Sequence, residues 1–199
     1  YMAQPFYMQY EAEYNGCKNC EDSYQQFLQV YGRMREPLNG LYYHAYDDSR
    51  QMFWCDKVTG LSENFWLRAM GWYAMALIDT MEVMPVSMTC QKARLNSIYK
   101  ELIDAMLPYQ DQATGMWYQV VNRGGIAPNY LEESGSAIFA YAIMKSVRLH
   151  YLTEEYFKYG QKAFDGICST YLSEKDGSLQ LGGICLVAGL GNTDMREGT

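Results

Sequence analysis

The chain has 199 residues, of which 49% are hydrophobic and 20% charged. This composition is sufficient for one globular domain with a sizeable core and argues against disorder. With 23 acidic and 16 basic residues the net charge is −7, and no basic cluster interrupts that acidity. We therefore expect neither nucleic acid nor a membrane as a partner. Aromatic residues make up 15% of the chain, which suits core packing and stacking on sugar rings equally.

Six cysteines are scattered along the chain, apart from the pair Cys17 and Cys20. This is not a disulfide framework. The pair fits either half of a zinc site or a local disulfide bridge. Because no second such pair follows and structural zinc needs four ligands, we expect no metal.

Five helices are predicted, in chain order. Glu21 to Arg35 is amphipathic. The next runs from a cap at Ser62 to Pro85, is apolar nearly all round and should be buried on most sides. Residues 90–107 carry their apolar side chains on one helix face. Residues 131–152 are mostly small and apolar, and 155–172 are again amphipathic. Glycine-led, strand-like pieces lie between them, at Gly40, at Gly115 and around Asp176.

Buried and amphipathic helices alternate in this pattern, which is a loose internal repeat. Two concentric layers of helices would satisfy it, so we predict an all-α fold, an α/α toroid, with residues 1–199 forming a single domain. An irregular helical bundle is the alternative. Since about three inner and outer pairs are visible, we expect the ring to be incomplete and this chain to be a piece of a longer one.

Arg68 and Trp72 lie four residues apart and share a helix face, with Trp66 on the first turn. An arginine near a helix N-terminus works against the helix dipole, although Glu63 or Glu82 are possible partners. A guanidinium beside indole rings suits a sugar carboxylate. A buried arginine satisfied by backbone carbonyls is the alternative.

His44 follows Tyr43 in the segment just ahead, among aromatic and acidic neighbours. A histidine in such a setting is more often structural than catalytic. Asp47 and Asp48 are best interpreted as a solvated turn. Trp117 either lines the same mouth as His44 or plugs it.

Several segments resemble the unsaturated rhamnogalacturonyl hydrolases, glycoside hydrolase family 105: "YMAQPF" at residues 1–6, "GLYYHAYD" at 40–47, "FWLRAMGWYAMAL" at 65–77, "EESGSAIFAYAI" from 132, and "GLG" from 189. The resemblance implies an (α/α)6 barrel. It implies removal of the Δ4,5-unsaturated galacturonyl residue from the non-reducing end of pectin-derived oligosaccharides. It also implies that Tyr43, His44, Trp66, Arg68 and Trp72 line the substrate pocket, with His44 supporting catalysis.

In that family an aspartate protonates the double bond at C4, water adds at C5, and the hemiketal collapses. Ordinary paired-carboxylate displacement is not involved. The aspartate lies just before the segment that matches "YMAQPF", so the resemblance places the general acid upstream of Tyr1. The resemblance thus makes this chain the C-terminal part of the barrel, and we expect residues 1–199 alone to be inactive. It also implies that the reaction needs no metal and no organic cofactor. The expected partner is a small acidic oligosaccharide.

Three other functions stay open at the level of sequence. The same chemistry could act on unsaturated glucuronyl substrates, because the visible residues do not read hydroxyl stereochemistry. The chain could also be a non-catalytic carbohydrate-binding module. A metal-dependent, cyclase-like toroid would need Cys17, Cys20 and a histidine to converge.

Overall fold

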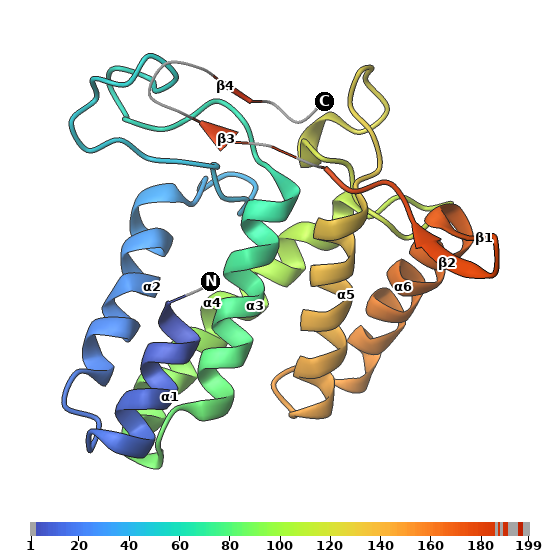
Figure 1. The fold of residues 1–199 in the computed structure, drawn as a ribbon. Helices are drawn as coiled ribbons and strands as arrows, with labels where there is room; N and C mark the ends of the chain where they lie inside the picture. Colours follow the sequence, from blue (N-terminus) through green and yellow to red (C-terminus); the bar gives the residue numbers. More distant parts are fainter. Residues whose placement is uncertain (1–2, 186, 188, 191–194, 197–199) are drawn as a thin grey trace.

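The computed structural model describes residues 3–185, 187, 189–190 and 195–196. Within them the α-helices are α1 (Gln4–Tyr14), α2 (Cys20–Met34), α3 (Leu67–Val83), α4 (Thr89–Met106), α5 (Glu133–Arg148) and α6 (Phe157–Tyr171) (Figure 1). In this part of the chain, none of the helices combines the length and the apolar character that crossing a bilayer requires.

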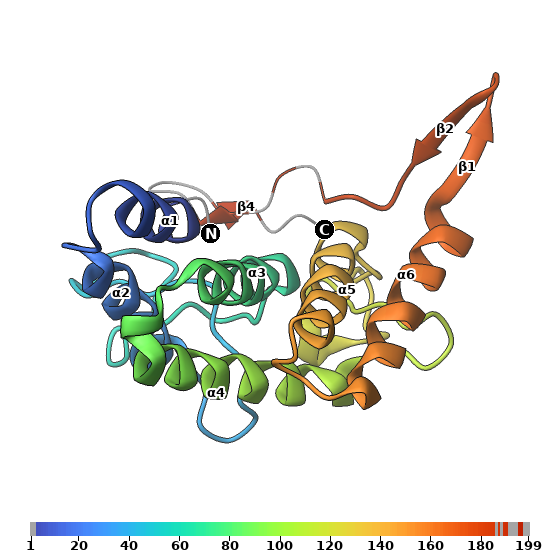
Figure 2. The same cartoon turned by 90° about the horizontal axis from the view of Figure 1, so that it is seen from below.

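The helices form two layers. Figure 2 shows α1, α3 and α5 side by side in one layer and α2, α4 and α6 in the other. Each inner helix is followed in sequence by its outer partner. The predicted all-α fold with an inner and an outer layer is therefore confirmed for these three pairs, and the irregular bundle is wrong.

The core lies between the two layers. The fully buried side chains of α3 and α4 interlock there, among them Leu77, Met81, Leu95 and Ile98. Each such side chain contributes about 1.5–3 kcal/mol when it leaves water. This apolar packing explains why α3 is hydrophobic nearly all round, as its sequence predicts.

The predicted start of α3 is wrong by about one turn. Ser62 does not cap the helix, because its hydroxyl accepts the Ala45 N–H at 3.0 Å. The first helical residue is Leu67, whose N–H donates to the Gln119 carbonyl at 2.9 Å. Trp66 precedes it in an extended conformation and bridges to Val120. Hydrogen bonds to a distant segment of the same chain thus take the place of a first helical turn here.

The sequence analysis did not predict α1. Its exposed side carries Phe6 and Tyr14, with 71% and 75% of their surface accessible, whereas Glu11 is buried. The Glu11 carboxylate accepts hydrogen bonds from Asn15 and from the Asn19 N–H, and so closes the turn into α2. Apolar periodicity fails as a guide when the aromatic residues point outward and a carboxylate points inward.

Cys17 and Cys20 form a disulfide in that same turn, with Cys20 at the start of α2. Of the two possibilities kept open for this pair, the structure has the local bridge. In the part of the chain that is described, no group of three His, Cys, Asp or Glu side chains could hold a metal ion.

Three turns of identical construction precede the loops at one end of the molecule. In each, a glycine donates its N–H to the carbonyl of an acidic residue four positions earlier, and the φ angle of the glycine is positive. The pairs are Glu36 and Gly40 (2.9 Å), Asp56 and Gly60 (2.8 Å), and Asp111 and Gly115 (2.8 Å). Only glycine adopts such φ values at no cost.

The strand-like pieces after Gly40 and Gly115 are single β-bridges rather than strands, because each extended residue pairs with a different segment. The segment around Asp176 does form a hairpin. Its strands are β1 (Leu172–Lys175) and β2 (Ser178–Leu181), which pair antiparallel and project from the body in Figure 2. A second short pair joins β3 (Gly189–Leu190) and β4 (Met195–Arg196).

Candidate functional site at the mouth of the inner helices

The N-terminal ends of α3 and α5 meet the long loops at one end of the fold. Figure 1 shows the loops around residues 40–66 and 116–132 gathered there, with residues 182–185 and β3 beside them. Loops held at the end of a rigid helical scaffold are where binding residues concentrate. Of the predicted site residues, His44, Trp66 and Arg68 lie at this mouth, whereas Tyr43 and Trp72 line other cavities.

His44 and Trp66 are in direct contact. Their ring centroids lie 3.9 Å apart with 34° between the planes. The backbone N–H of His44 donates to the Asn64 carbonyl at 3.1 Å, which fixes the ring over the indole. Burial, together with the positive charge of Arg68, lowers the pKa of His44 to about 4. The imidazole is therefore neutral near neutral pH, and its buried Nδ1 has no hydrogen-bond partner among the described residues.

Arg68 is the second residue of α3. Its Nη1 donates to the Cys185 carbonyl and, at 3.4 Å, to the Ser134 hydroxyl. The partners considered from sequence are wrong: Glu63 pairs with Arg123 at 2.9 Å, and Glu82 pairs with Lys145. Arg68 thus makes no ion pair within the described residues, and its charge faces neutral acceptors.

Glu132 organises the other side of the mouth and was missed by the sequence analysis. It is fully buried and caps α5, accepting the N–H groups of Ser134 (3.1 Å) and Gly135 (2.7 Å). It also accepts the Ser134 hydroxyl at 2.7 Å and the Cys185 N–H at 3.0 Å. Glutamate is not among the preferred N-cap residues, and the link of Glu132 to Cys185 is a tertiary contact, so neither role is visible in the sequence.

Tyr43 does not join His44 and Trp66. Its N–H bonds to the Met34 carbonyl, whereas that of His44 bonds to Asn64, so the two residues are held by different neighbours. The Tyr43 hydroxyl donates to the Glu36 carboxylate at 2.6 Å. This hydrogen bond is the main cause that raises the pKa of Tyr43 to about 12.

Trp72 lies one turn beyond Arg68 along α3. It lines a groove of about 250 Å³ between α1, α2 and α3, together with Gln4 and Gln26. The shared helix face predicted for Arg68 and Trp72 is kept, but His44 and Trp66 line a different cavity.

Of the two roles predicted for Trp117, the structure has the buried one. Trp117 is entirely buried and donates its Nε1–H to the Met106 carbonyl at 2.9 Å, so it is part of the core.

Two adjacent cavities share one wall at the mouth, formed by Glu63, Asn64 and Trp66. The first, which we call the histidine cavity, has a volume of about 160 Å³ and includes His44. The second, which we call the loop cavity, measures about 180 Å³ and lies against residues 120–129. Each volume is small, and the two together form a continuous polar and aromatic face.

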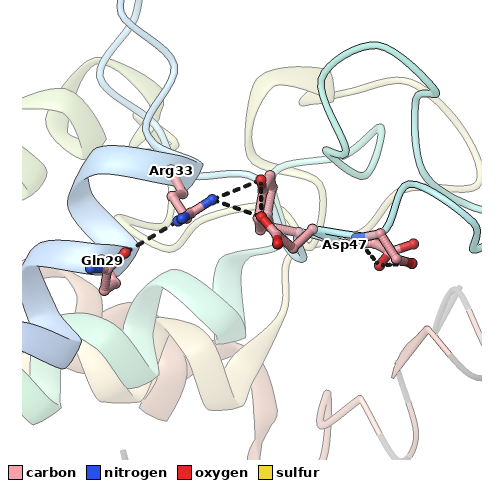
Figure 3. A network of polar contacts seen from close by, with 6 residues as sticks. Gln29, Arg33 and Asp47 are labelled. Carbon is pink, nitrogen blue, oxygen red and sulfur yellow. Dashed lines mark hydrogen bonds and ion pairs between the residues drawn. The ribbon is translucent and has the colours of Figure 1, made fainter.

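Asp47 and Asp48 form a turn, as interpreted from the sequence. Hydrogen bonds from the Met52 N–H and other groups of the turn lower the pKa of Asp47 to about 2. Asp48 pairs with Arg33 of α2 at 3.0 Å, and the Nε–H of Arg33 also donates to the Gln29 side-chain oxygen at 3.2 Å. Figure 3 shows this network linking α2 to the turn. These contacts hold the loop that carries His44.

Two helix layers with a loop-built mouth at the N-terminal ends of the inner helices define an α/α toroid. The sequence model of Glycosyl Hydrolase Family 88 matches residues 1–198, so the chain belongs to that family. A glycoside hydrolase of family 105 from C. acetobutylicum ATCC 824 has a similar structure, with a TM-score of 0.93 and 42% identity. That similarity covers all of this chain and 55% of the other. The assignment to family 105 is thereby confirmed.

Two curated relatives were also found. Protein Atu3128 of Agrobacterium fabrum is 36% identical over 205 residues, covering all of this chain and 86% of that protein. The unsaturated rhamnogalacturonyl hydrolase YesR of Bacillus subtilis is 29% identical over 157 residues, covering 79% of this chain and 40% of YesR. The chain therefore spans about half of the family 105 structure and less than half of YesR.

Proposed function

We propose that this chain belongs to an enzyme that removes the Δ4,5-unsaturated galacturonyl residue from the non-reducing end of rhamnogalacturonan oligosaccharides. Membership of a family of unsaturated uronyl hydrolases supports the reaction class. The similarity to YesR supports the rhamnogalacturonan substrate. The observation that carries the proposal is Arg68: a cationic side chain at the mouth, beside His44, without a carboxylate partner among the described residues.

In this proposal Arg68 binds the carboxylate of the unsaturated uronate. A guanidinium can form two parallel hydrogen bonds to a carboxylate, which fixes the plane of the sugar. Its present acceptors, the Cys185 carbonyl and the Ser134 hydroxyl, are neutral, so an anionic ligand competes with them favourably. Tyr43 and Trp72 line cavities other than the one at His44, so the proposal assigns them no contact with the carboxylate.

His44 supports the reaction as a neutral hydrogen-bonding group. Its unpartnered Nδ1 is available to a sugar hydroxyl or to the attacking water, and Trp66 holds the ring in place. In the reaction, C4 of the double bond receives a proton, water adds at C5, and the resulting hemiketal collapses to release the neighbouring sugar. One acid/base group is sufficient for these steps.

The proton donor in this proposal is an aspartate outside residues 1–199. The buried Glu132 is unsuitable as the donor, because its carboxylate accepts four hydrogen bonds as the cap of α5. A polypeptide limited to residues 1–199 should therefore bind an unsaturated galacturonyl disaccharide without consuming its double bond. Loss of alkene absorbance with that polypeptide would contradict the assignment of the donor.

The test of the proposed function is the substitution Arg68→Ala. Loss of the guanidinium should raise the KM for an unsaturated galacturonyl-rhamnose disaccharide, or the Kd in a binding assay, by about tenfold or more. Arg148→Ala is the matched control, because Arg148 is an exposed arginine at the far end of α5. Equal values for Arg68→Ala and the unchanged protein would remove the carboxylate-binding role.

Two further ligands separate the alternatives. An unsaturated glucuronyl disaccharide that is processed faster than the galacturonyl one would reassign the substrate. A saturated galacturonyl disaccharide that binds as tightly as the unsaturated one, with no product formed by any longer form of the protein, would indicate a non-catalytic carbohydrate-binding module.

A further inference from the structure

The disulfide between Cys17 and Cys20 lies in the turn between α1 and α2. Figure 1 places this turn at the end of α2 away from the mouth, so the proposed function does not use it. The two sulfurs differ in their access to solvent. Cys17 is partly exposed, whereas only 2% of the Cys20 surface is accessible. A thiol outside the protein therefore reaches the bridge at Cys17.

Hydrogen bonds hold the turn in shape independently of the bridge. The buried carboxylate of Glu11 accepts the Asn15 amide at 2.8 and 3.0 Å, the Asn19 N–H at 2.8 Å and the Asn19 side-chain amide at 3.2 Å. The Cys17 N–H donates to the Glu11 carbonyl at 2.7 Å.

The bridge itself adds little to the stability of the fold. Only Lys18 and Asn19 lie between the two cysteines. The conformational entropy that a bridge removes from the unfolded chain grows with the length of the closed loop, so a loop this short contributes least. Together with the hydrogen bonds to Glu11, this means that the fold should persist when the bridge opens.

Each sulfur also has surroundings that suit its reduced form. Cys20 is the first residue of α2, which has 15 residues, and the partial positive charge at a helix N-terminus stabilises a thiolate. Glu21 and Asp22 oppose this effect, but both are exposed to solvent, which screens their charge. The Sγ atom of Cys17 lies 3.9 Å from Sδ of the buried Met88, an acceptor for the S–H group. Cys20 is thus the better leaving group.

We propose that Cys17 and Cys20 form a reversible dithiol/disulfide pair that exchanges with small thiols. A reductant thiolate attacks Sγ of Cys17, the bond between the two protein sulfurs breaks, and its electron pair leaves on Cys20. A second reductant thiolate attacks the reductant sulfur of this mixed disulfide. That step releases the oxidised reductant and the Cys17 thiolate, and each protein thiolate takes a proton from water. Oxidation follows the same steps in reverse.

The experiment equilibrates the unchanged, native protein with reduced and oxidised glutathione at a fixed ratio. Acid stops the exchange, free thiols are alkylated in denaturant, and peptide mass spectrometry reports each cysteine. Opening the bridge consumes two glutathione thiols and yields one oxidised glutathione. Diluting all glutathione tenfold at a constant ratio should therefore lower the proportion of dithiol to disulfide at Cys17 and Cys20 about tenfold.

Cys90 is the matched control, because it is a free, exposed cysteine in the first turn of α4. Its mixed disulfide forms from one oxidised glutathione and releases one thiol, so the same dilution should leave its extent unchanged. The far-UV circular dichroism spectrum of the reduced protein should equal that of the oxidised protein. A bridge that opens only in denaturant, or a fold that is lost on reduction, would overturn the proposal.

Two variants test which sulfur is attacked. In Cys20→Ser, oxidised glutathione should form a mixed disulfide with Cys17 at least about tenfold faster than with Cys20 in Cys17→Ser, because Cys20 is shielded from solvent. Both rates are measured on native protein by intact mass. Equal rates would show that the attack is not directed to Cys17.

Discussion

His44 shows at the scale of one residue how burial sets chemistry. Its ring is enclosed by Trp66 and faces the charge of Arg68. Both effects oppose protonation, so the side chain is kept neutral over a range where an exposed histidine would already be charged. A neutral imidazole can donate one hydrogen bond and accept another, which is what a supporting role in hydration requires.

This environment predicts a specific dependence of stability on pH. The pKa of His44 falls from 6.5 to about 4 on folding. Between these values the unfolded chain binds a proton that the folded chain does not, so the free energy of unfolding decreases as the pH falls through this window. From about pH 6.5 to about pH 5 the loss should approach ~2 kcal/mol.

Urea unfolding of the unchanged protein and of His44→Phe, at several pH values, measures this effect. Phenylalanine keeps a ring against Trp66 but does not titrate, so the difference in stability between the two proteins should shift by that amount. His150→Asn is the control for the second histidine, which is exposed and has a φ of +62° that asparagine tolerates. A pH-independent difference for His44→Phe would show that His44 is not shielded.

Glu132 and Glu133 are neighbours whose substitution should change the free energy of unfolding by different amounts. Glu132 accepts four hydrogen bonds, whereas the pKa of Glu133 is raised by burial and then by the charge of Glu132. Glu132→Gln should therefore lower the free energy of unfolding by at least about 2 kcal/mol. Glu133→Gln should cost about 0.5 kcal/mol or less, since it also removes a repulsion. Equal losses in chemical unfolding would contradict the assigned role of Glu132.

At the scale of elements, two of the glycine turns set where a loop leaves its helix, one after α2 at Gly40 and one after α4 at Gly115. Gly115 has a φ of +76°, and a Cβ there would come within 2.7 Å of the Lys162 carbonyl on α6. Gly125 has nearly the same φ, +74°, but open space around it. The pair separates the cost of the backbone conformation from the cost of a close approach.

Gly125→Ala should destabilise the protein by about 1–2 kcal/mol, which is the cost of a left-handed alanine. Gly115→Ala should cost about 1–3 kcal/mol more, because the turn and α6 must also move apart. Midpoints and slopes of urea unfolding curves measure both values. If the two variants are equally stable, the contact between the turn and α6 is looser than the structure indicates.

At the scale of the whole molecule, apolar periodicity predicted the outer helices and the two-layer arrangement, because both depend on which helix faces are buried. It missed α1, whose buried Glu11 is recognisable only from the turn that it caps. It also misplaced the start of α3, where Trp66 pairs with Val120 from a distant segment. The resemblance predicted which residues lie at the mouth, among them His44 and Trp66. The separation of Tyr43 from His44 could not be predicted, because it depends on hydrogen bonds of their backbone N–H groups to different segments.

The three acid-to-glycine turns have a consequence for how this polypeptide folds. Each closes within five residues and needs no distant partner for its backbone hydrogen bond. Contacts this local form rapidly, because little chain entropy is lost before they are made. Folding therefore has several independent starting points along the chain, as in repeat proteins. The slow steps are then the docking of successive helical hairpins and the closing of the mouth by the segment that reaches Arg68.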